Sequence, residues 1–173
     1  MKKLFIFCLL LLAAPSALRA QDAAPAAVLT ATETNRAAAL KAYEAFNAQN
    51  WDALDAVVDK DLVDHQSPPG WPAGLAGLKS FSKQIAASFP DYKRSVEDII
   101  VSGDKVVVRL TLSGTQRGDW LGIKPNGRKF SISAVDIIRF KDGKGVERWG
   151  NQDDLSMIQQ LSALSAAENS DIK

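Results

Sequence analysis

The sequence contains one cysteine, Cys8, and one histidine, His65. A structural metal site of the usual kind needs three or four such ligands, and a disulfide needs two cysteines. The sequence therefore predicts neither a metal site nor a disulfide. The core must be stable without either of them.

The chain also lacks a long hydrophobic run. The longest apolar stretch, Leu4 to Ala14, is shorter than the ~20 residues that a membrane-spanning helix needs. Two lysines precede it, and a proline and small residues follow, which is typical of a secretory signal peptide. We predict a signal peptide over residues 1–20, cleaved near Ala20 or at Ala17, and a periplasmic or secreted mature protein. Stable membrane insertion after cleavage is not expected, and Cys8 is removed with the signal.

Neither sign of charge is in large excess. The chain has 21 basic and 20 acidic residues. Once Lys2, Lys3 and Arg19 are removed, 18 basic residues remain against 20 acidic ones, and the net charge becomes −2. Nucleic-acid binding depends on clustered positive charge and has no support here. A neutral or weakly polar small-molecule ligand fits this balance better.

The mature chain is expected to form one domain with short extensions. Residues 21–30 are rich in alanine and predict a flexible lead, whereas residues 166–173 form a polar tail. Residues 31–165 would be the folded domain. About 150 residues suffice for a single ordinary core.

Helical periodicity dominates the first half of this domain. Apolar spacing predicts helices over 32–49, 51–58 and 75–89. Between the last two, the segment 67–74 holds three prolines and two glycines, which excludes regular structure and suits the rim of a site.

Strand chemistry dominates the second half. Residues 92–153 are rich in β-branched side chains, alternate with a period of two, and contain turn sequences at SGDK and KDGKG. A short helix over 155–164 follows. Helices first and a meander second predict an α+β fold in which the helices cover one face of a bent sheet.

One acidic residue falls on an apolar strand face. Asp136 alternates in phase with residues expected to face the core, namely Phe130, Ile132, Ala134, Ile138 and Phe140. A buried carboxylate must be hydrogen-bonded, paired or protonated, so Asp136 is a candidate catalytic acid or base. Alternatively, a bulge turns Asp136 to solvent, or Arg109 or Arg139 neutralises it as a structural pair.

The last strand offers a second set of candidates. By alternation Trp149, Asn151 and Asp153 share one face, where they would line a cavity as an aromatic wall, an amide and a carboxylate. The alternative is that Asp153 or Asp154 caps the final helix, and Asp154 is the more expected cap of the two.

His65 could act as a general acid or base, because the imidazole titrates near neutral pH. The alternative is a solvent-facing or structurally hydrogen-bonded ring before the proline-rich loop. Tyr43, Phe46 and Trp120 are candidate ligand contacts, although aromatic residues at such positions more often fill a core or rim.

Several motifs occur in a fixed order along most of the mature domain: FPD, SGDKV, GTQRG, GIKPNG, RFKDGKG and WGNQDDLSMIQQL. In this order the chain resembles the SnoaL-like polyketide (ester) cyclases of the nuclear transport factor 2-like superfamily. His65 precedes the motifs, near a common histidine position of the family. The sequence departs from the pattern at Gln116, Asn126 and Gly145, where the family usually has His, Thr and Ile.

The resemblance implies a cone-shaped α+β barrel, in which a curved, mostly antiparallel sheet is wrapped by the N-terminal helices around one deep pocket, often as a homodimer. It also implies ring closure by intramolecular aldol condensation, with an acidic residue as general acid/base and with no metal or cofactor. The carboxylate of the W-x-x-x-D motif corresponds to Asp153.

Two hypotheses follow. In the first, the chain is an enzyme acting on a carbonyl or ester compound: Asp153 moves a proton, His65 and Gln116 hydrogen-bond the oxyanion, and Asp136 orients one of them. Its substrate contacts would be Trp149, Asn151, Gln116, Tyr43, Phe46 and Trp120. In the second, the same pocket belongs to a non-catalytic periplasmic module that captures an apolar small molecule.

Overall fold

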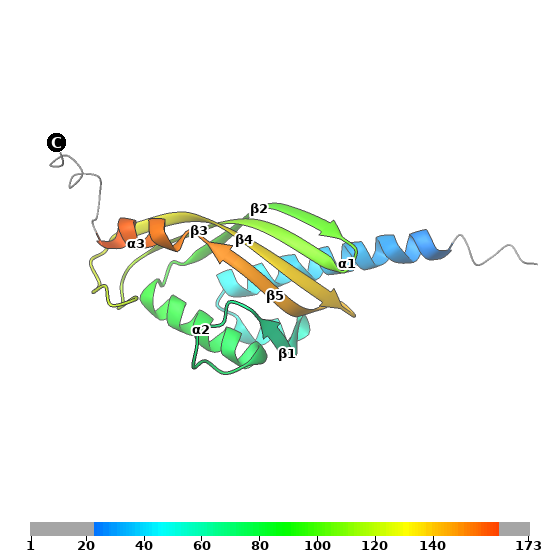
Figure 1. The fold of residues 1–173 in the computed structure, drawn as a ribbon, viewed down its shortest axis with the longest axis horizontal. Coiled ribbons are helices and arrows are strands. Elements are labelled where there is room, and N and C mark those ends of the chain that lie inside the picture. The colour runs from blue at the N-terminus through cyan, green and yellow to red at the C-terminus, as the bar shows by residue number, and fades with distance from the viewer. Residues whose placement is uncertain (1–22, 163–173) are drawn as a thin grey trace, which may run out of the picture.

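The structure is a computed structural model that describes residues 23–162 (Figure 1). The predicted signal peptide and polar tail lie outside the described residues. The elements, in chain order, are α1 (Ala23–Asn47), the 3-10 helix η1 (Trp51–Ala56), β1 (Val58–Asp64), α2 (Gly74–Ser88), β2 (Lys93–Ser102), β3 (Lys105–Thr115), β4 (Lys129–Lys141), β5 (Lys144–Gln152) and α3 (Asp154–Ser162).

Helix α1 starts earlier than predicted. It begins at Ala23 rather than near residue 32, so most of the segment expected to be a flexible lead is helical. The composition explains the difference, because this stretch is mostly alanine, the residue with the highest helix propensity. Its one proline, Pro25, lies in the first turn, where no intrahelical N–H bond is lost.

The second predicted helix is shorter than expected. Residues 51–56 form a 3-10 helix whose start is capped by Asn50, since the Asn50 side chain accepts a hydrogen bond from the Ala53 N–H. Val58 then begins β1, which pairs in parallel with β5. The sheet is therefore mostly antiparallel, with one parallel pair at its edge.

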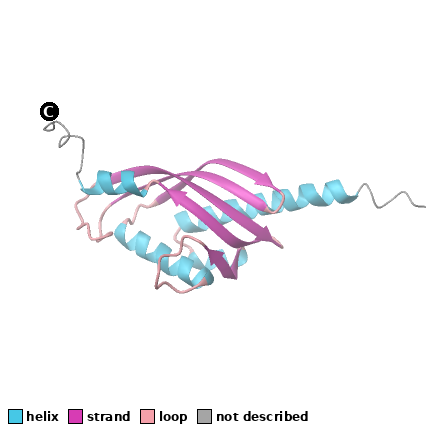
Figure 2. Cartoon of the chain, in the orientation of Figure 1, coloured by secondary structure: helices cyan, strands magenta, loops and turns pink. Residues whose placement is uncertain are grey.

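The five strands form a single curved sheet in the order β1-β5-β4-β3-β2 (Figure 2). Helices α1 and α2 lie along its concave side, and α3 continues from β5 at one end. The alternation predicted for β3 is confirmed, because its even positions are buried and line the inner face: Val106, Val108, Leu110 and Leu112. This arrangement is the cone-shaped α+β fold that was predicted.

Aromatic rings close one end of the cone. The Phe89 ring, which has no solvent exposure, packs edge-on against Phe130 at 5.0 Å and against Trp120 at 5.5 Å between centroids. Such edge-to-face contacts add to the free energy gained by burying the rings. Polar residues gather on another side of the interior.

Helix α2 holds the proline-rich loop at van der Waals distance. A Cβ atom added to Gly77 would lie 1.8 Å from the carbonyl oxygen of Pro72. Only glycine permits this approach, which holds Pro72, at the end of the proline-rich loop, against the first turn of α2.

We expect Gly77→Ala to lower the free energy of unfolding by about 1–3 kcal/mol, since the loop must move away from α2. The sign of this change in the free energy of unfolding is informative, because Gly→Ala within a helix ordinarily stabilises the protein by about 1 kcal/mol. Chemical denaturation measures the change, and Ala76→Gly at the exposed neighbouring position calibrates helix propensity alone. A more stable Gly77→Ala protein would contradict the close packing of Pro72.

Candidate active site

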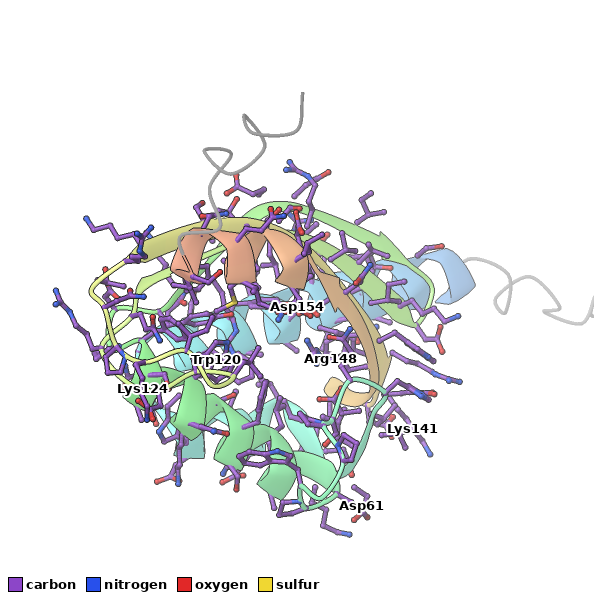
Figure 3. All side chains as sticks on the ribbon, turned by 60° about the vertical axis from the view of Figure 1, so that its left-hand side comes forward. Asp61, Trp120, Lys124, Lys141, Arg148 and Asp154 are labelled. Carbon is purple, nitrogen blue, oxygen red and sulfur yellow. The ribbon has the colours of Figure 1, made fainter. Side chains whose placement is uncertain are left out.

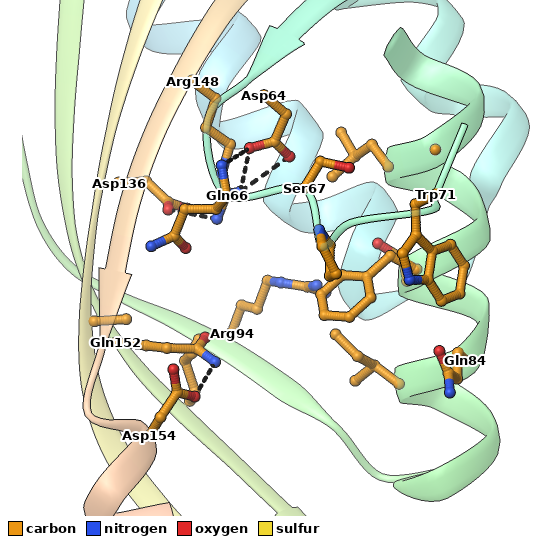
Figure 4. Close-up of a pocket in the computed structure, with 18 of the residues that line it drawn as sticks. Asp64, Gln66, Ser67, Trp71, Gln84, Arg94, Asp136, Arg148, Gln152 and Asp154 are labelled. Atoms are coloured by element: carbon orange, nitrogen blue, oxygen red, sulfur yellow. Dashed lines mark hydrogen bonds and ion pairs between the residues drawn. The ribbon is translucent and has the colours of Figure 1, made fainter. Parts of the chain in front are cut away.

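The concave side of the sheet encloses a cavity of about 640 Å³ (Figure 4). Its walls come from α2, from the loop after β1 and from the inner faces of the strands. A smaller cavity of about 60 Å³ reaches toward α1 and shares Arg94, Asp136 and Arg148 with the larger one. The larger volume lies in the range of pockets that hold small organic ligands. Trp120 and Arg148 lie on opposite sides of this central space (Figure 3).

A polar cluster forms one wall of the cavity, and we call its four members the Asp136 cluster: Tyr43, Asp64, Asp136 and Arg148. The Tyr43 hydroxyl donates to Asp136 Oδ2 at 2.8 Å, and Arg148 Nη2 donates to Asp136 Oδ1 at 2.8 Å. Arg148 Nη1 reaches both carboxylate oxygens of Asp64, at 3.1 and 3.2 Å. Asp136 is only 7% exposed. One guanidinium thus compensates two poorly exposed carboxylates.

Electrostatics fix the protonation of two members of the cluster. Burial, together with the neighbouring charge of Asp136, raises the pKa of Tyr43 well above its usual value, so the phenol stays protonated and donates. Burial opposes the charged form of Arg148, but the carboxylates of Asp136 and Asp64 outweigh it and raise the Arg148 pKa. Arg148 is therefore permanently cationic.

Gly150 makes room for the cluster on β5. It lies opposite Asp136 in the β4–β5 register. A Cβ atom at Gly150 would lie 2.6 Å from Asp136 Oδ1, 2.8 Å from Arg148 Nη2 and 2.9 Å from Gln66 Oε1. These three polar groups therefore meet over the missing side chain. Among the described residues, no hydrogen-bond partner is found for the Gln66 side-chain amide.

Arg94 projects from β2 into the same cavity (Figure 4). Its guanidinium carbon lies 4.3 Å from the Phe46 ring centroid and 4.8 Å from that of Tyr92. The Asn47 side chain bonds both the N–H and the C=O of Arg94, at 2.8 and 2.9 Å, which holds β2 to α1 at this point. Burial lowers the pKa of Arg94, because desolvation disfavours the charged form.

The wall opposite the cluster is apolar and aromatic. Trp71 from the proline-rich loop meets the Phe81 ring of α2 edge-on at 5.7 Å, and Phe81 in turn contacts Trp120 at 6.2 Å. Leu78 and Ile85 complete this side. A ligand with a flat apolar body and a few polar oxygens matches such a cavity.

His65 lies at the mouth of the cavity. Its Nε2 contacts Glu147 Oε1 at 2.8 Å, and its ring stacks on Trp149 at 5.1 Å with nearly parallel planes. The predicted oxyanion role does not match this position, because the side chain is half exposed and engaged with two neighbours on β5.

Asp153 is not in the cavity, and the prediction that it projects there beside Trp149 is wrong. Its Oδ1 accepts from the Ser156 N–H at 3.0 Å and its Oδ2 from the Ser156 hydroxyl at 2.6 Å, so it caps α3. The predicted preference for Asp154 as the cap is also wrong. Asp154 instead lines the mouth of the cavity, where it accepts a hydrogen bond from Gln152 at 2.7 Å.

The register of β5 explains the error. Asp136 lies opposite Gly150, and Ile138 opposite Arg148, so these β5 positions take the inner face. Trp149 lies opposite the exposed Ile137 on the outer face and does not line the cavity. Asn151, also in the outer phase, borders the cavity only at the exposed end of the strand.

Of the four other predicted contacts, three line a cavity and one does not. Tyr43 and Phe46 line the smaller cavity, and Trp120 lines the larger one. Gln116 does not line either: its side chain is fully buried and donates to the carbonyls of Gly118 and Ile123, so the predicted oxyanion contact is wrong.

Four residues of the site were missed by sequence reasoning: Asp64, Gln66, Arg94 and Arg148. The neutralising arginine was expected at position 109 or 139, but Arg109 is exposed and Arg139 pairs with Glu147. A signal for Arg148 was present in the sequence, because Arg148, Gly150 and Gln152 alternate along β5. The prediction took the other set of alternating residues, Trp149, Asn151 and Asp153, as the one that faces the cavity.

Among residues 23–162, no group of three or more potential metal ligands lies close enough together to hold a metal ion. Within the same range, no helix combines the length and apolarity that crossing a membrane requires.

The fold defines a class: cone-shaped α+β proteins with a cavity between a curved sheet and its helices. The family model described as SnoaL-like polyketide cyclase matches residues 37–161. The chain belongs to the SnoaL-like polyketide cyclase family.

Solved structures agree with this assignment. TsrD from Streptomyces laurentii is 29% identical with a TM-score of 0.70, over 76% of this chain and 96% of TsrD. IdmH from Streptomyces antibioticus is 31% identical with a TM-score of 0.67, over 74% of this chain and 98% of IdmH. A polyketide cyclase candidate from Bacillus cereus ATCC 10987 is 33% identical with a TM-score of 0.63, over 72% of this chain and 78% of its own. A search of curated proteins found no match.

We expect Arg148→Met to lower the free energy of unfolding by about 3–5 kcal/mol, because it leaves the carboxylates of Asp64 and Asp136 without their shared cation. Urea denaturation at neutral pH measures the loss. Arg139→Met is the matched control, since its pair with Glu147 is more exposed and should cost about 0–1 kcal/mol. Equal losses in both variants would contradict the central role of Arg148.

The cap of α3 should be sensitive to pH. Hydrogen bonds from the side chain and backbone of Ser156 lower the pKa of Asp153, so its stabilising effect is present above the unfolded pKa and is lost as pH falls through the lowered folded value. The melting temperature of Asp153→Ala should fall furthest below wild type near neutral pH, and the gap should narrow below about pH 4. The melting-temperature difference between wild type and Ser156→Ala should also narrow below about pH 4. A difference that does not depend on pH would contradict the ionised cap.

Proposed function

We propose that this chain is an exported enzyme that carries out acid/base chemistry on a small carbonyl or ester compound, with Asp136 as the proton-transferring group. The observation that carries the proposal is the Asp136 cluster, a carboxylate with 7% exposure that faces a ligand-sized cavity and is held in place by Tyr43 and Arg148. Family membership supports chemistry on carbonyl compounds.

The proposed step is removal of a proton from the carbon next to a carbonyl. Asp136 takes the proton, and the electrons of the C–H bond form the enolate double bond, which leaves the negative charge on the carbonyl oxygen. Each Asp136 oxygen already accepts one hydrogen bond. A carboxylate has about four lone-pair sites, so one directed at the cavity can accept the proton. Proton transfer by a fixed carboxylate avoids the entropic cost of recruiting a base from solution.

Gln66 supplies the donor for the enolate oxygen. Gln66 is exposed at the mouth of the cavity, and its side-chain oxygen lies beside Asp136 over Gly150. The side-chain amide has no hydrogen-bond partner among the described residues, so a half-turn of the amide group brings its N–H to the same place. An amide N–H directed at a developing oxyanion stabilises the transition state more than the ground state. The base and the oxyanion donor would then act on neighbouring atoms of one substrate.

Export rests on the sequence alone. A basic start, an eleven-residue apolar stretch and small residues before Ala20 support a periplasmic or secreted protein.

The test is exchange of α-protons with deuterated water, followed by proton NMR on a panel of aryl alkyl ketones and keto esters. Asp136→Asn should slow exchange by about 10²–10⁴-fold, because a placed base contributes a factor of that size. Asp153→Asn is the matched control, since that carboxylate caps α3 outside the cavity, and it should exchange as wild type does.

Wild-type exchange no faster than buffer for the whole panel would contradict the proposal and favour the non-catalytic binding module. Equal rates in wild type and Asp136→Asn would remove Asp136 from the chemistry.

A further inference from the structure

The two arginines of the cavity differ in how their charge is compensated. The charge of Arg148 is paired within the protein, because both of its Nη atoms donate hydrogen bonds to carboxylates of the Asp136 cluster. Arg94 has no carboxylate of the described residues within salt-bridge distance and no hydrogen bond from its guanidinium to them. A cation enclosed by protein without a counter-charge is costly, and such groups are retained where a ligand meets them.

The way Arg94 is held leaves its hydrogen-bond donors available. Phe46 and Tyr92 lie close to the guanidinium, at 4.3 and 4.8 Å between its carbon and each ring centroid, a cation–π arrangement. A cation–π contact does not use an N–H donor in a hydrogen bond, and no described residue accepts a hydrogen bond from the Arg94 guanidinium. Its donors thus remain available for a partner in the cavity, and a guanidinium can offer two parallel N–H groups to a planar two-oxygen group.

Arg94 is also fixed before any ligand arrives. Its backbone is bonded on both sides by the Asn47 side chain, and it faces inward opposite the buried Leu112 of β3. Figure 4 shows its side chain projecting into the cavity. A preorganised guanidinium loses little further entropy when it binds a planar two-oxygen group.

We propose that Arg94 is the binding site for a carboxylate carried by the ligand, so that the substrate class is an acid with an apolar, ring-sized body rather than a neutral ester. The carboxylate accepts two parallel hydrogen bonds from Arg94, and the body lies against Trp71, Phe81 and Trp120. This inference rests on the proposed function only in placing the reacting carbonyl near Asp136. The binding itself requires no chemistry.

The test compares a keto acid with its own ester. The probes are 4-oxo-4-phenylbutanoate and its methyl ester, and isothermal titration calorimetry gives the dissociation constants. Wild type should bind the acid about tenfold or more tightly than the ester, because a charge-assisted bidentate pair exceeds a neutral contact by that order. Arg94→Met should lose this preference while its affinity for the ester stays unchanged.

Arg109→Met is the matched control, because it removes the same charge from an exposed position of the neighbouring strand. It should keep the preference for the acid. The melting temperature separates binding from structure: methionine can still pack against Phe46 and Tyr92, so Arg94→Met should melt no lower than Arg109→Met. A markedly lower melting temperature for Arg94→Met would give Arg94 a structural role and overturn the inference.

The inference is also overturned if wild type binds both probes equally, if it binds no acid below about 10 mM, or if Arg94→Met weakens both equally. Repeating the titrations with Asp136→Asn separates the two proposals. A preserved acid preference in that variant, with proton exchange abolished, supports both. Loss of the preference in Arg94→Met without any exchange in wild type would leave the carboxylate site standing and remove only the chemistry.

Discussion

The ion pair between Arg148 and Asp136 is the interaction on which the interior of this protein depends. A domain of this size could bury apolar side chains at the same positions, and such replacements of buried ion pairs are often neutral or stabilising. Here the space beside the pair is left open as a cavity, and Tyr43 and Asp64 complete its hydrogen bonds. A charged, incompletely filled interior that is unfavourable for stability is the pattern expected of a functional site.

The register of one strand decides which residues share this interior. On β5 the inner phase brings Arg148, Gly150 and Gln152 to the cavity, whereas a shift of one residue would bring Trp149 and Asn151 instead. Gly150 is decisive, because any side chain there would collide with Asp136 and Arg148. The inner phase also explains why Asp153, one residue beyond the strand, is free to cap α3.

The helices, the turns and the inner face of β3 could be predicted, because period and turn chemistry are local properties of the chain. The burial of Asp136 followed from the same alternation. Its partner Arg148 was missed because the other phase of β5 was taken as the inner one. Asp64 could not be found from alternation, since it is 84 residues from Arg148 and meets it only through the parallel β1–β5 pairing. Arg94 gave no sequence signal, because a lone arginine in a strand ordinarily faces solvent. The homodimer stays a prediction.

The two arginines therefore have different electrostatic roles in the cavity. Arg148 keeps the negative charges of the Asp136 cluster compatible with burial, and its donors are used in doing so. Arg94 lies close to two aromatic rings that support its charge but cannot neutralise it. Exchanging their environments would leave the carboxylates unpaired and remove the free donors. The hollow core thus carries one cluster whose two carboxylates share a single guanidinium, and one cation with no salt bridge to the described residues. A ligand that spans both is oriented by that difference.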